Sequence, residues 1–89
     1  MELQDLRVFI SVYEACNFQQ ASKALSITQS SVSWRIRRLE REVSGALFVR
    51  LPRGVRPTPK ADTLYRYALR HIALLKETER AMKPETGAA

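Results

Sequence analysis

Residues 17–43 read NFQQASKALSITQSSVSWRIRRLEREV, and this stretch decides the fold of the chain. Asn17 is a typical helix N-cap, and a glutamine stands three residues after it, as in a capping box. Phe18, Ala21 and Leu25 then form the short apolar face of a first helix.

The residues SIT at 26–28 interrupt that pattern, and Thr28 is a good N-cap for a second helix. From Gln29 to about Val43, apolar residues recur at spacings of four, three and four, which predicts one buried face: Val32, Ile36, Leu39 and Val43. Two helices joined by so tight a turn form a helix-turn-helix, whose second helix enters the major groove of DNA.

The opposite face of this second helix has the composition of a surface that reads DNA. The helical spacing directs five side chains outward: Ser30, Trp34, Arg37, Arg38 and Arg41. Gln29 and Ser33 lie at the edge of that face. Small side chains let the backbone approach the groove, glutamine pairs with adenine, and arginine pairs with guanine or phosphate.

The segments on both sides of the motif complete a small domain. Apolar residues spaced by three and four predict a helix from Leu3 to about Ala15, with a core stripe: Leu3, Leu6, Phe9, Ile10 and Tyr13. Two apolar runs around a Pro/Gly tip at 51–54 predict a two-stranded ribbon. Thr58-Pro59 opens a last helix that continues without glycine or proline to about Lys83.

The basic residues are concentrated in one window. Residues 33–60 carry eight basic and two acidic side chains, so this window has a net charge of +6, equal to that of the whole chain. Seven of the eight are arginines, which favours planar contact with phosphates and base edges. A nucleic-acid partner is therefore the leading interpretation, with an anionic membrane surface second.

Other classes of function lack the residues they need. One cysteine, Cys16, and one histidine, His71, exclude a disulfide framework and most metal or triad chemistry. We find no nucleophile–base pair, carboxylate dyad or phosphate-cradling glycine loop, so we expect no enzyme, cofactor or metal. The N-terminus has no signal-peptide pattern, and no apolar run approaches a membrane span, so we expect a cytoplasmic protein without a membrane partner.

Short motifs follow one another in a fixed order along residues 1–82. They are LQDLRVF at 3–9, NF at 17–18, ASKAL at 21–25, TQ at 28–29 continuing through Ser33 to Ile36, RLE at 38–40, LF at 47–48 with Arg50, GV at 54–55 and TP at 58–59. This ordered set resembles the N-terminal domain of LysR-type transcriptional regulators, which are bacterial proteins.

The resemblance implies a mainly α fold: a winged helix-turn-helix of three helices and a two-stranded β wing, followed by a long dimerisation helix. We expect the DNA-binding domain at 1–58, the motif at 18–37, the wing at 46–57, the linker helix at 59–83 and a flexible tail at 84–89. In the family, a separate C-terminal domain binds an effector, and a full-length protein can form a tetramer. The sequence therefore looks like a DNA-binding fragment or a truncated member.

The family pattern also implies which residues contact DNA. Base contacts fall on Gln29, Ser30, Ser33 and Trp34; backbone contacts fall on Thr28, Ser31, Arg35, Arg37, Arg38, Arg41 and Arg50; the wing contact falls on Arg53. Trp34 stands where the family often has a basic or polar residue. An indole has one donor and a flat apolar face, so we expect it to contact a thymine methyl or a sugar and to alter operator preference.

The last helix predicts a homodimer on a pseudo-palindromic operator. Its main apolar stripe gives the predicted dimer interface: Ala61, Tyr65, Ala68, Ile72, Leu75 and Met82. A second apolar side needs another neighbour: Leu64, Tyr67, Leu69 and Leu74. The alternatives are a winged-helix module that binds an acidic protein partner and, more weakly, a membrane-surface helix at 59–83.

Overall fold

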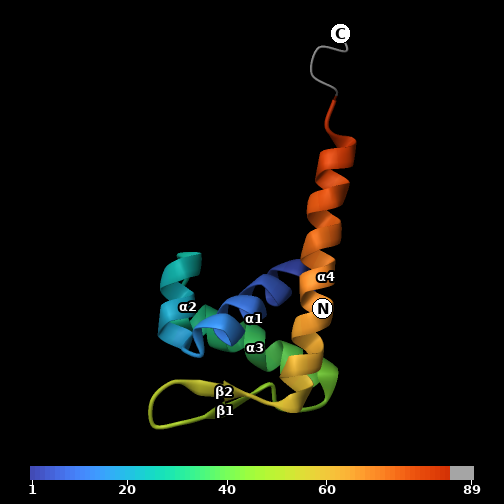
Figure 1. Cartoon of the computed structure of the whole chain (residues 1–89). Helices are drawn as coiled ribbons and strands as arrows, with labels where there is room; N and C mark the ends of the chain where they lie inside the picture. The colour runs from blue at the N-terminus through green and yellow to red at the C-terminus, as the bar shows by residue number, and fades with distance from the viewer. Residues whose placement is uncertain (85–89) are drawn as a thin grey trace.

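The structure, a computed structural model, describes residues 1–84 (Figure 1). The elements are α1 (Leu3–Ala15), α2 (Phe18–Leu25), α3 (Gln29–Val43), β1 (Phe48–Arg50), β2 (Val55–Pro57) and α4 (Pro59–Met82). The two strands pair antiparallel, with Val49 opposite Arg56. The predicted fold class, three helices with a two-stranded wing and a long last helix, is confirmed. Of the predicted tail, residues 85–89 lie outside the described residues.

Local sequence signals set the helix boundaries. The side chains of Asn17, Thr28 and Thr58 accept hydrogen bonds from backbone N–H groups three residues later, at 2.9, 3.1 and 3.2 Å. At the other ends, α1, α2 and α3 stop where the chain turns left-handed, at Cys16, Ser26 and Ser44. The predicted N-caps of α2, α3 and α4 are therefore confirmed.

The core is built around α1, which packs against the other three helices. Phe9 is fully buried, as predicted, but so are Val8 and Val12, which the predicted stripe left out. Ile10 and Tyr13 are only partly buried. A helix with three neighbours buries a wider face than one apolar stripe, which is why the predicted face of α1 was too narrow.

Two stacked tyrosines fix α4 on α1. The rings of Tyr13 and Tyr65 lie 4.0 Å apart between centroids, with their planes inclined by 10°. The Tyr13 hydroxyl donates to Asp62 at 2.8 Å, and the Tyr65 hydroxyl donates to Glu14 at 2.6 Å, so each helix supplies one phenol and one carboxylate. These hydrogen bonds raise the pKa of both phenols above the ordinary value. The stack fixes the direction in which α4 leaves the domain.

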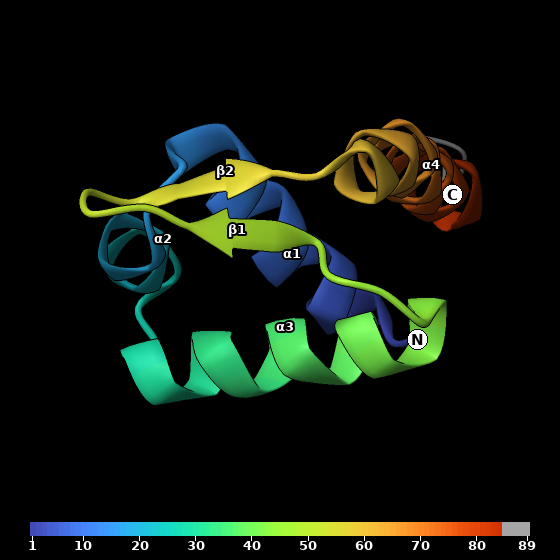
Figure 2. The same ribbon diagram turned by 90° about the horizontal axis from the view of Figure 1, so that it is seen from below.

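The wing is anchored to the turn between α1 and α2. Figure 2 shows the hairpin and α3 from below, with α4 seen end-on at one side. The Val55 N–H donates to the Cys16 carbonyl at 3.0 Å, and the Arg50 guanidinium lies 4.9 Å from the centre of the Phe18 ring. Gly54 at the hairpin tip has φ +77, a backbone conformation that costs little only for glycine.

Gly54→Ala is expected to destabilise the protein by about 1–3 kcal/mol because it places a side chain on a left-handed residue. The new Cβ would also press against the Cys16 carbonyl oxygen, which holds the wing. Gly45→Ala is the matched control, since its Cβ would meet only the flexible end of Lys60. Urea unfolding followed by circular dichroism compares the two, and equal stability would contradict this wing geometry.

Candidate nucleic-acid interface

The helix α3 and the wing occupy one end of the molecule, and α4 extends away from that end (Figure 1). On α3, the side chains of Gln29, Ser30, Arg37 and Arg41 are exposed and Ser33 is half-buried. Trp34 is 49% exposed, a large value for the only tryptophan of the chain. The four residues that the sequence predicts to contact bases are therefore all exposed or half-buried.

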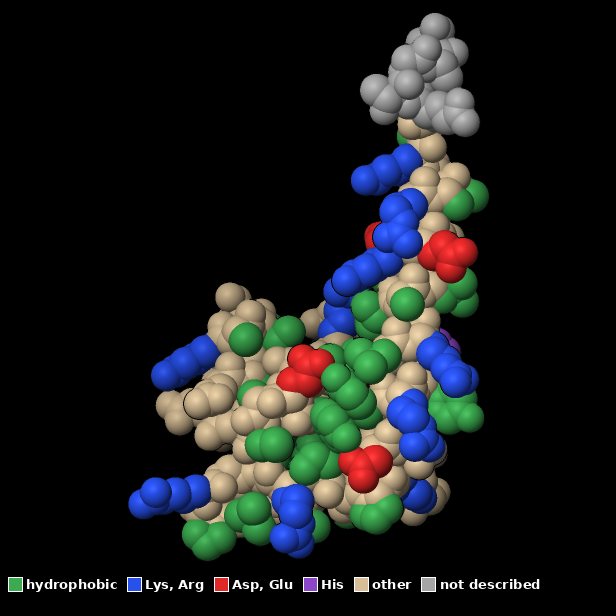
Figure 3. All heavy atoms as spheres, in the orientation of Figure 1, with side chains coloured by type: hydrophobic (Ala, Val, Ile, Leu, Met, Phe, Trp, Pro, Cys, Tyr) green, Lys and Arg blue, Asp and Glu red, His purple; other side chains and the backbone are tan. Residues whose placement is uncertain are grey.

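A hollow separates α3 from the wing. Ser33 and Arg37 line it from α3, Arg50 lines it from β1, and Phe18 lines it from α2. Among residues 1–84, neither arginine forms an ion pair with a carboxylate. Glu40 lines the hollow as well, and its carboxylate accepts a hydrogen bond from the Leu47 N–H at 2.8 Å. With that carboxylate engaged, the two guanidinium groups and the Ser33 hydroxyl are the groups that suit a phosphate. Figure 3 shows further basic side chains at this end of the molecule and along α4.

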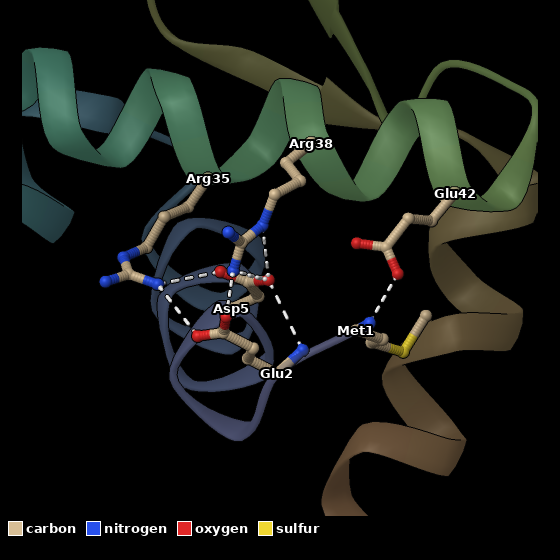
Figure 4. Close-up of polar contacts among 6 residues, drawn as sticks. All are labelled: Met1, Glu2, Asp5, Arg35, Arg38 and Glu42. Atoms are coloured by element: carbon tan, nitrogen blue, oxygen red, sulfur yellow. Dashed lines mark hydrogen bonds and ion pairs between the residues drawn. The ribbon is translucent and has the colours of Figure 1, made fainter.

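The sequence predicts that Arg35 and Arg38 contact the DNA backbone, but in the structure these two side chains are engaged elsewhere. Both turn to the side of α3 and bind Asp5 of α1, whose side chain is fully buried (Figure 4). Arg35 Nη1 donates to Asp5 Oδ1 at 2.8 Å, and Arg38 donates to Oδ2 through Nε at 3.0 Å and Nη2 at 2.6 Å. The outward placement of Arg38 was wrong because a buried carboxylate requires charged partners, and these two arginines are within reach.

Glu2 completes this cluster of two carboxylates and two guanidinium groups. Its carboxylate lies 3.1 Å from Arg38 Nη2 and 4.0 Å from Arg35 Nη1. Burial raises the pKa of the Asp5 carboxyl, but the hydrogen bonds from Arg38 and Arg35 outweigh burial, and the pKa lies below its ordinary value. Asp5 stays ionised, and its carboxylate together with that of Glu2 balances the charges of the two arginines.

The remaining predicted contacts lie at the start of α3 and on the hairpin. Thr28 is exposed but already engaged, since its hydroxyl caps α3 and lies 3.0 Å from the Ser31 hydroxyl and 3.1 Å from that of Ser30. Gln29 lines a shallow hollow together with residues of the wing and of α2. Arg53 is exposed at the tip of the hairpin. Four of these five residues therefore lie at the cap and first turn of α3, and Arg53 lies on the wing.

Half of the predicted dimer stripe is covered by the chain itself. Ala61 and Ala68 are fully buried and cannot form an open interface, and Tyr65 is half-buried because its ring stacks on Tyr13 of α1. The prediction failed there because the stripe faces α1 at the start of α4. Farther along, Ile72 and Leu75 are half-exposed. Exposed apolar side chains remain on α4: Tyr67, Leu69, Leu74 and Met82.

The described residues contain no group of three or more metal-binding side chains. Within residues 1–84, no helix is both long and apolar enough to cross a membrane.

Comparisons with known proteins agree with this geometry. The family described as bacterial regulatory helix-turn-helix protein, lysR family, matches residues 3–62. The regulator BudR of Klebsiella aerogenes is 45% identical over 74 residues, which are 83% of this chain and 52% of BudR. The regulator AbaB of Streptomyces antibioticus is 40% identical over 77 residues, 86% of this chain and 26% of AbaB. The chain thus spans about half of the first relative and about a quarter of the second.

Two solved structures of DNA complexes have the same fold. The BenM DNA-binding domain with benA site 1 has a TM-score of 0.85 at 33% identity, covering 91% of this chain and 94% of that one. The CbnR DNA-binding domain with DNA has a TM-score of 0.88 at 28% identity, covering 91% and 93%. Sequence and structure together show that the chain belongs to the LysR family of bacterial helix-turn-helix regulators.

Proposed function

We propose that the chain is the DNA-binding part of a bacterial transcription regulator and binds duplex DNA sequence-specifically. The helix α3 enters the major groove, and the wing contacts the minor groove or the backbone. The observation that carries this proposal is the exposed face of α3 next to the wing: Trp34 and Arg37 are exposed, and Arg37 lines one hollow with Arg50, which forms no ion pair within residues 1–84. The similarity to the BenM and CbnR complexes with DNA supports it.

Each residue of this surface has a role that its chemistry supports. Base edges are contacted by Gln29, Ser30, Ser33 and Trp34, and the backbone by Thr28, Ser31, Arg37, Arg41, Arg50 and Arg53. Arg35 and Arg38 leave the set of phosphate contacts because Asp5 holds them. The protein acts in the cytoplasm, by binding rather than by catalysis.

A homodimer through α4 fits this function. Two copies of α3 would dock in successive major grooves, so the operator would be pseudo-palindromic. Ile72, Leu75 and Met82 of the predicted stripe remain open to a partner, and Leu64 and Tyr67 line an apolar hollow nearer the start of α4. In a longer protein, a C-terminal domain would bind the effector and a tetramer would form. The acidic-partner alternative is not favoured, because no relative named above points to it.

Selection of bound sites from random duplex DNA tests the proposal. With about six phosphates neutralised per dimer, the slope of log affinity against log salt should be near −5. Trp34→Ala should reduce discrimination between the selected site and random DNA roughly tenfold, because a mismatched base pair in a specific site typically costs about 1–3 kcal/mol. Fluorescence anisotropy of labelled duplexes measures both quantities. A slope near zero, or no enrichment of any site, would refute the proposal.

A further inference from the structure

The buried Asp5 carboxylate links α1 to α3, the proposed recognition helix. These contacts lie outside the exposed surface proposed to bind DNA. The two oxygens of the Asp5 carboxylate are divided between two arginines of α3, Oδ1 to Arg35 and Oδ2 to Arg38. The side chains of these arginines are only 26% and 25% exposed. Arg37 and Arg41, on the same helix, are exposed and form no ion pair within residues 1–84.

Arg38, which binds Asp5, also contacts the exposed Trp34 side chain. The Cζ of Arg38 lies 4.6 Å from the centre of the Trp34 ring, within the range of a cation–π contact. The Cζ of Arg35 lies farther from the same ring, at 5.9 Å. An exposed indole on a helix otherwise has several rotamers available. The Arg38 guanidinium, which Asp5 holds in place, favours one of these rotamers, because any other rotamer would move the indole away from it and lose the cation–π contact.

We infer that Asp5 is a positioning residue that sets the specificity of DNA binding. Through Arg38 it holds the Trp34 indole in one orientation on the groove face, and it keeps two guanidinium groups away from phosphates. Phosphate contacts add affinity for every sequence alike, whereas base contacts distinguish sequences. Neutralising Arg35 and Arg38 therefore lowers affinity for random DNA and increases the share of binding that depends on bases. This inference rests on the proposed function.

Asp5→Asn tests the inference, because it removes the charge with little change in shape. The free variant should show Trp34 more accessible to acrylamide quenching, since Arg38 is no longer held over the ring. With DNA, its affinity for random duplex should rise roughly fivefold or more, and its salt slope should steepen by about two units per dimer, because one arginine in each protomer loses its carboxylate while Glu2 still pairs with the other. Its preference for the selected site should fall.

Glu42→Gln is the matched control. It removes one negative charge from α3 and one ion pair, that with the N-terminal amine of Met1, without touching Trp34 or Arg38. It therefore adds the same net charge as Asp5→Asn. We expect it to leave the quenching of Trp34 unchanged and the site preference close to that of the parent. Equal effects of the two variants would show that only net charge matters and would overturn the inference.

Arg38→Gln decides the matter if Asp5→Asn does not fold, which circular dichroism would reveal. This variant keeps the Asp5–Arg35 pair and should expose Trp34 to quencher and weaken site preference, without the gain in affinity for random duplex. Quenching and site preference equal to those of the parent would overturn the inference. If the parent binds no duplex at all, the proposed function fails, while quenching of the free proteins still decides whether Asp5 positions Trp34.

Discussion

Arg37→Glu is expected to lower affinity for the selected operator by on the order of 10²- to 10⁴-fold. Arg37 is exposed on α3 and, with Arg50, lines the hollow between that helix and the wing. Each charged hydrogen bond to a phosphate contributes about 1.5–3 kcal/mol, and a dimer loses one in each protomer. The introduced carboxylate also repels the phosphate. Because the loss concerns the backbone, random and selected duplexes should lose affinity by similar factors.

Arg80→Glu is the control for this prediction. It changes the net charge by the same amount, but Arg80 is exposed in the last turn of α4, at the far end from α3 and the wing (Figure 1). Anisotropy titrations at several salt concentrations should show a shallower salt slope for Arg37→Glu and nearly the parental slope for Arg80→Glu. Comparable losses in the two variants would mean that long-range charge, not contact through Arg37, drives binding.

The order of the elements could be predicted because its signals are local in sequence. Asn17 and Thr28 cap helices through hydrogen bonds to groups three residues away, and the spacing of Val32, Ile36 and Leu39 marks the buried face of α3. The exposed position of Trp34 follows from the same periodicity. For these features, a short window of sequence holds all the interacting partners.

Features that depend on which elements meet could not be predicted. Asp5 lies 30 and 33 residues from Arg35 and Arg38, and nothing in the sequence of α1 says which helix will face it. The one available signal was an acid one helical turn before the buried Phe9. The interface stripe of α4 failed for the same reason, because periodicity identifies an apolar face but not whether α1 or a second subunit covers it.

Phe9→Ala is expected to remove about 3–5 kcal/mol of stability, the usual cost of truncating a buried phenylalanine. Phe9 is fully buried, and its ring centroid lies 5.6 Å from that of Phe48 and 5.9 Å from that of Tyr13. It therefore joins α1 to the wing. A chain of 89 residues has roughly 4–13 kcal/mol of total stability, so a large share is lost.

Val49→Ala is the control, since Val49 neighbours Phe48 on β1 but is 40% exposed and should cost under about 1 kcal/mol. Urea unfolding at one fixed protein concentration compares the variants, because dimerisation couples stability to concentration.

A ligand that binds only the folded state adds about 2.7 kcal/mol to the free energy of unfolding at a hundred times its dissociation constant. Saturating operator should therefore restore most of the folding of Phe9→Ala, because the substitution removes none of the residues proposed to contact DNA. Equal unfolding midpoints for the two variants without DNA would contradict the core position of Phe9. No recovery with DNA would show that the DNA-binding surface of α3 and the wing does not form once the core is disrupted.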